Sequence, residues 1–260
     1  MRVKHDKPRG ILNARAADGL RRYWPSDDLA PFVEHYWIVR WNVSAPVTAE
    51  TLPHPSVHMV LGHGPSEVVG VMRGRFTTTL EGAGRVLGTK FRPGAFRALI
   101  DRPVSSLSDR RWPLREVFGT RADGFDTAAL AEEEDTRAVA VIESFLRSLQ
   151  PAADAQMELA GRIAARIAED RQITRVEQIA DELGMSARQL QRLFREYVGA
   201  TPKWVIQRYR LIEAAEQLSA GAAGLTRLAH DLGYADQAHF IRDFKRIVGR
   251  PPADYARTLR

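Results

Sequence analysis

Histidine is the residue type whose spacing in this sequence first raises the question of a metal site. The segment TLPHPSVHMVLGHG carries His54, His58 and His63, and His35 precedes it. Imidazole nitrogens bind transition metals when several ligands converge, usually with carboxylate or cysteine help. On a strand, His58 and His63 would face opposite sides, and neither an H-x-H nor an H-E-x-x-H motif nor an acidic partner accompanies them. We therefore expect no metal site and no other cofactor.

The same histidines are placed to line a pocket for a small molecule. Aromatic side chains with a few polar groups line most ligand sites, and the alternating segment FVEHYWIVRW supplies two tryptophans nearby. We expect an effector pocket formed by Trp37, Trp41, His54 and His58. Packing of the two tryptophans in an ordinary hydrophobic core is the alternative.

Catalytic motifs are missing from the sequence. It contains no nucleophile elbow, Walker loop, dinucleotide-binding glycine fingerprint or zincin pattern. The segment EGAGRVLG lacks the required glycine spacing and predicts a hairpin turn instead. Cysteine is absent, which excludes disulfides, thiolate nucleophiles and zinc–thiolate sites. The sequence thus predicts that the chain is not an enzyme.

An internal repeat occupies the last part of the chain. IADELGMSARQLQRLFREYVGATP (179–202) matches LAHDLGYADQAHFIRDFKRIVGRPP (228–252). Each copy has a helix with a small alanine, a glycine that supplies a tight turn, and a second helix with an aromatic residue near its middle. Thr174 and Glu177 predict a capping box for the first helix of copy one, and Ser186 and Asp236 predict N-caps for the two second helices. The repeat predicts two helix–turn–helix motifs.

The second helix of each copy turns hydrogen-bonding side chains away from its apolar stripe. Arginine can bond guanine with two hydrogen bonds, glutamine can pair with adenine, and an apolar side chain suits the thymine methyl group. The residues predicted to read bases are Arg188, Gln191 and Arg192 in the first motif and Gln237, Ala238, His239, Ile241 and Arg242 in the second.

The segment between the copies, TPKWVIQRYRLIEAAEQLSAG, predicts one connecting helix over about 202–218. Such a helix spans roughly 26 Å, which suits two recognition helices placed about one DNA turn apart. The formal net charge of +6 also fits a polyanionic partner. The residues predicted to contact DNA phosphates are Thr174, Lys203, Arg208, Lys245, Arg246 and Arg250.

The elements that must position these residues differ between the two ends of the chain. Residues 1–120 carry short strand-like runs separated by glycine or proline, which predict an α+β domain with a mostly antiparallel sheet, either open or closed into a barrel. These runs cover 32–41, 57–62, 67–72, 75–80 and 85–91, and a short helix is predicted at 93–100.

Helical periodicity begins after this sheet. Residues 121–154 predict a helical connector whose apolar stripe is either intradomain core or a seam between domains or between two copies of the chain. The stripe consists of Ala138, Val141, Ile142, Phe145 and Leu149. The segment QPAADAQ then interrupts the pattern, and 155–260 predicts an all-α domain with the two motifs and their linker helix.

The repeated segments resemble the AraC/XylS family of transcription regulators. LGYADQAHFIRDFKRIVGRPPADY looks like that family's signature segment and IADELGMSARQLQRLFREYVGATP like its first helix–turn–helix. The resemblance covers about residues 155–260 and implies a cytoplasmic bacterial regulator that reads two adjacent major grooves and often activates transcription through RNA polymerase. Ala235 departs from the pattern, because members often carry serine there. The N-terminal part resembles a sensor-like domain found in some members.

We therefore predict a cytoplasmic DNA-binding transcription regulator controlled by a small-molecule effector at the N-terminal domain. Its expected partners are double-stranded DNA and RNA polymerase, with a homodimer as a further expectation. The sequence contains no run of about 18 apolar residues, so no membrane span is predicted. Two alternatives stay open: control by a protein partner or oligomerisation through the N-terminal domain, and a metal-dependent enzyme fused to a DNA-binding module.

Overall fold

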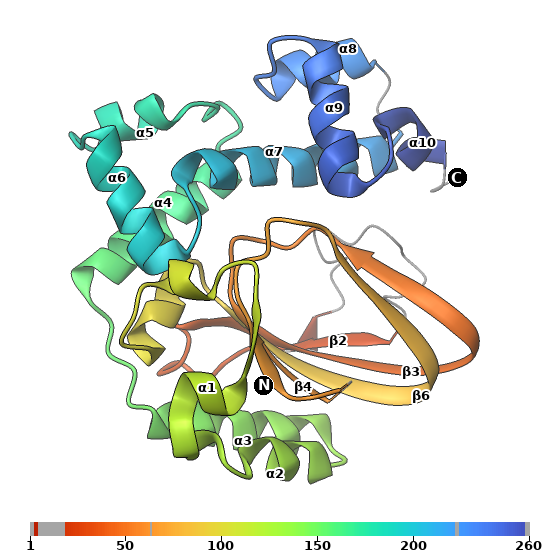
Figure 1. The fold of residues 1–260 in the computed structure, drawn as a ribbon, viewed down its shortest axis with the longest axis vertical. Helices are drawn as coiled ribbons and strands as arrows, with labels where there is room; N and C mark the ends of the chain where they lie inside the picture. Colours follow the sequence, from red (N-terminus) through yellow and green to blue (C-terminus); the bar gives the residue numbers. More distant parts are fainter. Residues whose placement is uncertain (1–2, 5–18, 63, 222–223, 258–260) are drawn as a thin grey trace.

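The computed structural model describes residues 3–4, 19–62, 64–221 and 224–257. His63, one of the histidines considered above, lies outside the described residues. A β-rich region is followed by an all-helical region (Figure 1). This arrangement confirms the predicted fold class of an α+β part followed by an all-α part with two helix–turn–helix motifs.

The described strands form one antiparallel sheet in the order β1-β2-β3-β6-β4-β5-β7. Their bounds are β1 Val3–Lys4, β2 Leu20–Tyr23, β3 Val33–Thr51, β4 His58–Gly62, β5 Glu67–Val69, β6 Phe76–Phe91 and β7 Arg111–Pro113. Among these strands, β1 and β7 are edges that do not pair with each other, so the sheet is open rather than closed into a barrel.

The two longest strands, β3 and β6, pair along almost their whole length and are longer than the sequence predicts. The register shifts between Val43 and Val47, and such a bulge bends a strand. The predicted hairpin at EGAGRVLG is wrong, because these residues lie inside β6. A side chain at Gly84 would collide with the Trp41 ring, so glycine here admits a tryptophan and makes no turn.

Short helices cover one face of the sheet (Figure 1). They are α1 Leu114–Phe118, α2 Phe125–Ala131 and α3 Asp135–Ser148, with the 3₁₀ helix η4 Gly119–Ala122 beside α1. The 3₁₀ helices η2 Ala95–Leu99 and η3 Val104–Leu107 instead pack against residues 194–198 of the C-terminal region. In the α3 stripe only Val141 is half-buried, and the other four residues are buried. The Phe145 ring stacks on Phe125 at 3.9 Å between centroids. The stripe therefore forms core within this region.

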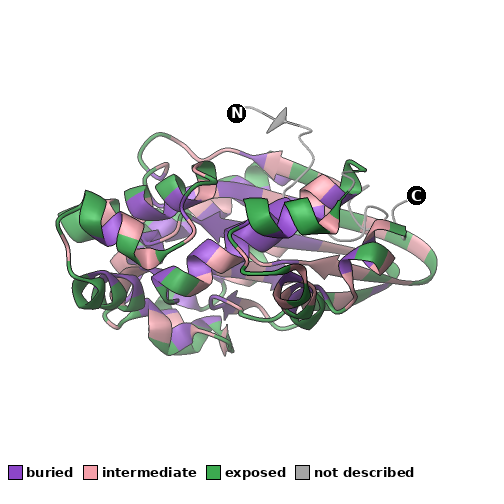
Figure 2. Cartoon of the chain, turned by 90° about the horizontal axis from the view of Figure 1, so that it is seen from above, coloured by how far each residue is buried: buried purple, intermediate pink, exposed green. Residues whose placement is uncertain are grey.

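The C-terminal region consists of helices joined by short turns. Their bounds are α4 Ala155–Glu169, α5 Val176–Glu182, α6 Ala187–Leu193, the π-helical turn η5 Phe194–Val198, α7 Pro202–Ser219, α8 Leu225–Asp231, α9 Gln237–Val248 and α10 Pro252–Arg257. The helix α7 is the predicted connector, and most of its residues are buried. Figure 2 shows that many outward helical surfaces are exposed, whereas the centre of the molecule is largely buried.

Two of the helix N-caps predicted from the sequence are present in the structure, and one is not. Ser186 Oγ accepts a hydrogen bond from Gln189 N at 3.3 Å, and Asp236 Oδ1 accepts one from His239 N at 2.7 Å, as predicted. The Thr174–Glu177 capping box is wrong. The backbone N–H groups of Thr174 and Arg175 both donate to Gln178 Oε1, at 2.9 and 2.8 Å. The amide of Gln178 reaches both donors, so it caps α5 instead.

Candidate nucleic-acid interface and N-terminal cavity

The recognition helix of the first motif, α6, separates a buried face from an exposed one. Leu190 and Leu193 are buried, which fixes the helix on the core. The three residues predicted to read bases on this helix, Arg188, Gln191 and Arg192, are all exposed. Their side chains form none of the hydrogen bonds or ion pairs found among the described residues. The helix thus presents two guanidinium groups and one amide to solvent.

The recognition helix of the second motif, α9, buries Phe240, Phe244, Ile247 and Val248. Two of its five predicted base-reading residues, Ala238 and Arg242, are exposed. The other three, described next, are held by neighbours.

Gln237 is half-buried, and its Oε1 accepts a hydrogen bond from Thr226 Oγ1 at 2.6 Å. The His239 ring lies edge-on to Tyr234, with its Nε2 at 3.8 Å from Asp243 Oδ2. Ile241 was expected outside, but it is half-buried and packs against the hydrophobic core. The second helix therefore offers a smaller free reading face than the first.

The predicted phosphate contacts divide into exposed and enclosed residues. Lys203, Lys245 and Arg246 are exposed, although Arg246 also donates to Asp243 Oδ1 at 3.1 Å. Arg250 is only partly exposed and forms an ion pair with Glu50. These three side chains are accessible to solvent, and their phosphate contacts stay predictions.

Two further residues predicted to contact phosphates are enclosed by the protein, Arg208 fully and Thr174 in part. Arg208 is 1% exposed, donates a hydrogen bond to the carbonyl of Arg73, and places its guanidinium 4.7 Å from the centre of the Trp204 ring. Thr174 is half-buried and packs against the Gly233 turn of the second motif. The Arg208 side chain cannot reach a phosphate in this arrangement, so that assignment is corrected, whereas the phosphate contact of the half-exposed Thr174 stays a prediction. Sequence periodicity could not show this, because both residues contact segments far away in the chain.

The concave face of the sheet encloses a cavity of about 400 Å³. Trp37, His54 and His58 line it, as predicted for an effector pocket. Trp41 does not, because its ring lies across Gly84 and its Nε1–H donates to the carbonyl of Glu81 at 3.1 Å. In β4 and β5 alternate residues line this cavity, His58 and Val60 in the first and Glu67 and Val69 in the second, since side chains in a strand alternate between the two faces of a sheet.

The cavity wall combines apolar side chains and neutral histidine with charged side chains, among them Glu34, Glu50 and Lys90. Burial, followed by the positive charge of Lys90, lowers the pKa of His58 to about 3. The Trp37 indole N–H donates to His58 Nδ1 at 3.4 Å, which leaves the proton of the neutral ring on Nε2. Ser56, a residue only 3% exposed, also lines the cavity, and its buried hydroxyl has no hydrogen-bond partner among the described residues. A ligand that accepts and donates hydrogen bonds would find partners on this wall.

The described histidines do not gather into a metal site. No group of three or more histidine, cysteine, aspartate or glutamate side chains among the described residues could hold a metal ion. Within the described part of the chain, no helix is both long and apolar enough to cross a membrane.

Other contacts join the cavity wall to the helical region. Glu50 lines the cavity and pairs with Arg75, at 2.8 Å between Oε1 and Nη1, and with Arg250, which follows α9. Arg75 also donates to the carbonyl of Val248, the last residue of α9, at 3.2 Å. The His54 ring lies edge-on to Tyr209 of α7, with 6.0 Å between ring centroids. The cavity therefore shares wall residues with the supports of the second motif.

Two tandem helix–turn–helix units on a common connecting helix define a nucleic-acid-binding class of protein. Comparisons agree with this geometry. A family model described as a helix-turn-helix domain matches residues 179–258, and a domain of unknown function (DUF6597) matches residues 21–113. The C-terminal region is thus similar to the DNA-binding region of AraC-like transcription regulators.

Curated relatives match the C-terminal region. An AraC-like transcription regulator of Streptomyces lividans is 38% identical over 80 residues, which cover 31% of this chain and 26% of that protein. The HTH-type transcriptional activator RhaS of Pectobacterium atrosepticum is 31% identical over 74 residues, covering 28% of this chain and 26% of that protein. The match thus spans about a quarter of the length of these relatives.

Solved structures with a similar arrangement include ToxT from Vibrio cholerae O395. That chain is 13% identical, with a TM-score of 0.43, over 86% of this chain and 97% of ToxT. The C-terminal domain of AraT, a response regulator from Geobacillus stearothermophilus, is 26% identical with a TM-score of 0.35, over 37% of this chain and 82% of that domain.

Proposed function

We propose that this chain is a sequence-specific DNA-binding transcription regulator whose two recognition helices read adjacent major grooves. The observation that carries the proposal is the exposed set Arg188, Gln191 and Arg192 on α6, together with the exposed Arg242 on α9. These side chain types hydrogen-bond to base edges in the major groove. The named relatives are transcription regulators, which supports a regulatory rather than a catalytic role. We also propose RNA polymerase as a second partner and the bacterial cytoplasm as the location of the protein.

Selection of bound sites from random double-stranded DNA tests this proposal with the full chain. The expected result is two short enriched blocks about one helical turn, roughly 34 Å, apart. Variants Arg192→Ala and Arg242→Ala should each lose base preference within a different block. An absence of any enriched sequence would contradict the proposal and leave only a basic helical surface.

A small-molecule effector in the N-terminal cavity is the proposed control. The cavity, its partnerless Ser56 hydroxyl and its neutral His58 support a mostly apolar ligand with a hydrogen-bonding group. Because Glu50 and His54 belong both to the cavity wall and to the supports of α9 and α7, an occupant can act on the second motif through contacts already present. Control by a protein partner has less support. Among the described residues, Leu183 is the large hydrophobic side chain that stands exposed, and it is isolated.

The effector proposal can be tested by tryptophan fluorescence during a screen of apolar metabolites. A ligand in the cavity should change the emission of Trp37, and the change should be absent in Trp37→Phe. The same ligand should alter DNA affinity in the wild-type chain, and Glu50→Gln should weaken that effect. A ligand-induced change that persists in Trp37→Phe would place the ligand elsewhere. The oligomeric state, measured by sedimentation with and without DNA, decides the homodimer proposal.

A further inference from the structure

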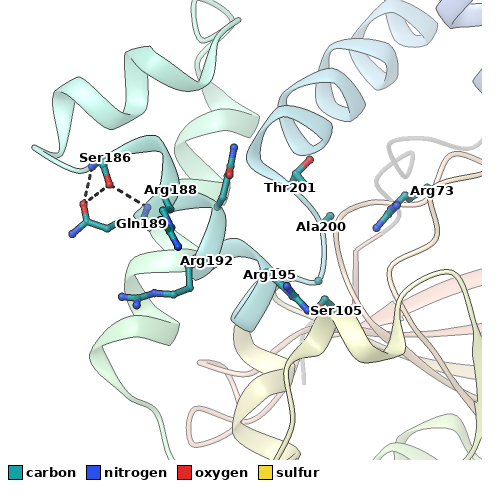
Figure 3. Close-up of a pocket in the computed structure, with 11 residues that line it drawn as sticks. Arg73, Ser105, Ser186, Arg188, Gln189, Arg192, Arg195, Ala200 and Thr201 are labelled. Atoms are coloured by element: carbon teal, nitrogen blue, oxygen red, sulfur yellow. Dashed lines mark hydrogen bonds between the residues drawn. The ribbon is translucent and has the colours of Figure 1, made fainter.

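An open groove of about 730 Å³ lies between α6 and the N-terminal region (Figure 3). We call it the arginine groove, because Arg73, Arg188, Arg192 and Arg195 all line it and none of its lining residues is acidic. Arg188 and Arg192 belong to the recognition helix, and Arg195 follows one turn later. Arg73 comes from the loop between β5 and β6, about 115 residues earlier in the sequence. The groove therefore brings the exposed face of α6 close to the Arg73 guanidinium of the N-terminal region.

The position of Arg73 is fixed from both sides. Its backbone N–H donates to Asp109 Oδ1 at 2.8 Å, and its Nε lies 3.3 Å from Asp109 Oδ2. Asp109 itself has φ of +57°, a left-handed conformation that aspartate and asparagine tolerate better than most residues. On the other side, the buried Arg208 of α7 donates to the Arg73 carbonyl. The connector helix thus holds the backbone of Arg73 while 56% of its side chain stays exposed.

The loop that carries Arg73 is also continuous with the effector cavity. Met72 and Phe76, on either side of the loop, line that cavity. Figure 3 shows Arg73 and Ser105 on the opposite side of the groove from Arg188 and Arg192. A guanidinium and a hydroxyl placed beside a recognition helix are groups that bind phosphate oxygens and fix the register of a protein on DNA.

We propose that Arg73, in the N-terminal domain, contacts a backbone phosphate of the same DNA duplex that α6 reads. This inference rests on the proposed DNA-binding function. The occupant is double-stranded DNA, because the groove is a continuation of the reading face and its charge is uniformly positive. The sensor-like region then supplies part of the DNA interface directly. Arg208, which was predicted to contact a phosphate itself, instead holds Arg73 in position through the Arg73 carbonyl.

The test measures binding of the full chain to its selected DNA over a range of salt concentrations. Loss of one phosphate contact lowers the slope of log affinity against log salt by about 0.9, which corresponds to roughly eightfold weaker binding near 0.1 M salt. Arg73→Ala should show both effects with unchanged base preference, and Arg73→Lys should keep most of the affinity. Asp109→Asn keeps an acceptor for the Arg73 N–H and removes a competing charge, so it should strengthen binding. Arg121→Ala, at an exposed arginine outside the groove, is the matched control.

The outcomes separate this inference from the function on which it rests. Wild-type affinity and slope in Arg73→Ala would overturn the phosphate contact. Weaker binding with an unchanged slope would also overturn it, because the loss would then come from the altered loop. Non-selective binding by the wild-type chain would instead overturn the proposed function, while the salt slope of Arg73→Ala would still decide the phosphate contact.

Discussion

The two helix–turn–helix motifs bury equivalent phenylalanines but differ in how their surroundings hold them. Phe194 and Phe244 occupy matched positions and are both fully buried. Leu183 and Leu232 are also matched in the repeat, yet Leu183 is 39% exposed and Leu232 only 4%. On the recognition helices, Gln191 is exposed, whereas Gln237 is bonded to Thr226. A repeat therefore preserves the scaffold of a motif more closely than its surface, and the first motif has the more available reading face.

The largest difference is expected between the matched leucines. Leu232→Ala should lower the free energy of unfolding by about 2–5 kcal/mol, since it empties a packed site. Leu183→Ala should cost less than about 1 kcal/mol, because much of that side chain already contacts solvent. Urea denaturation of both variants checks this pair. Equal losses would mean that the two motifs are packed alike and that the comparison fails.

The exposed arginines should show the next largest effects, now on DNA binding. Arg192→Ala and Arg242→Ala are each expected to weaken binding by about 1–3 kcal/mol and to relax base preference at one position. The two positions should lie in different blocks of the selected site. Binding titrations against single-base variants of that site measure both quantities. Retention of wild-type preference by both variants would show that these helix faces do not read bases.

A smaller and uniform effect is expected from Lys203, which lies in the first turn of α7 between the two motifs. Lys203→Ala should weaken binding to all sequences alike by about 1 kcal/mol, and it should reduce the salt slope by about 0.9. Comparison of selected and scrambled DNA over a salt series distinguishes this from base reading. A change in sequence preference would instead place Lys203 in the reading face of one motif.

The smallest difference is expected between the two glutamines of the recognition helices, Gln191 on α6 and Gln237 on α9, which are not equivalent in the repeat. Gln191→Ala should cost about 1 kcal/mol of binding free energy at an adenine contact. Gln237→Ala should cost less than about 0.5 kcal/mol, because Thr226 already occupies its amide oxygen. Thr226→Val is the useful companion, since it releases Gln237 without removing it. If Thr226→Val strengthens binding and the gain disappears in the double variant with Gln237→Ala, the hydrogen bond masks a reading residue.

Features set by local sequence could be predicted well. The connector was expected over about 202–218 and is found at Pro202–Ser219, because Pro202 can begin a helix and apolar periodicity continues through Leu218. The N-cap roles of Ser186 and Asp236 depend on residues three positions away and were also predicted. Trp37, His54 and His58 were expected to share a pocket, and all three line the cavity.

Features set by contacts between distant segments were missed. Arg208 is basic and lies on a helix, but its carbonyl partner, Arg73, is 135 residues away. Trp41 follows the alternation of its strand, yet its ring lies over Gly84 of the paired strand rather than in the cavity. Arg73 and Ser105 gave no local signal at all, since only the packing of the two regions brings them beside α6. Residue type predicts which interactions these side chains can form, but their partners are set by the packing of segments that are far apart in the sequence.

Because α7 is buried along most of its length, it fixes the distance and the rotation between the two recognition helices. Its 18 residues form a rod of roughly 27 Å that cannot be stretched or twisted without unpacking the core. Insertion of about 5 base pairs between the two blocks would turn the second block to the opposite side of the duplex. Insertion of about 10 base pairs would restore the side but move the block beyond reach. Under the proposed function, an operator for this chain would be defined by a fixed interval between its two blocks as much as by its bases.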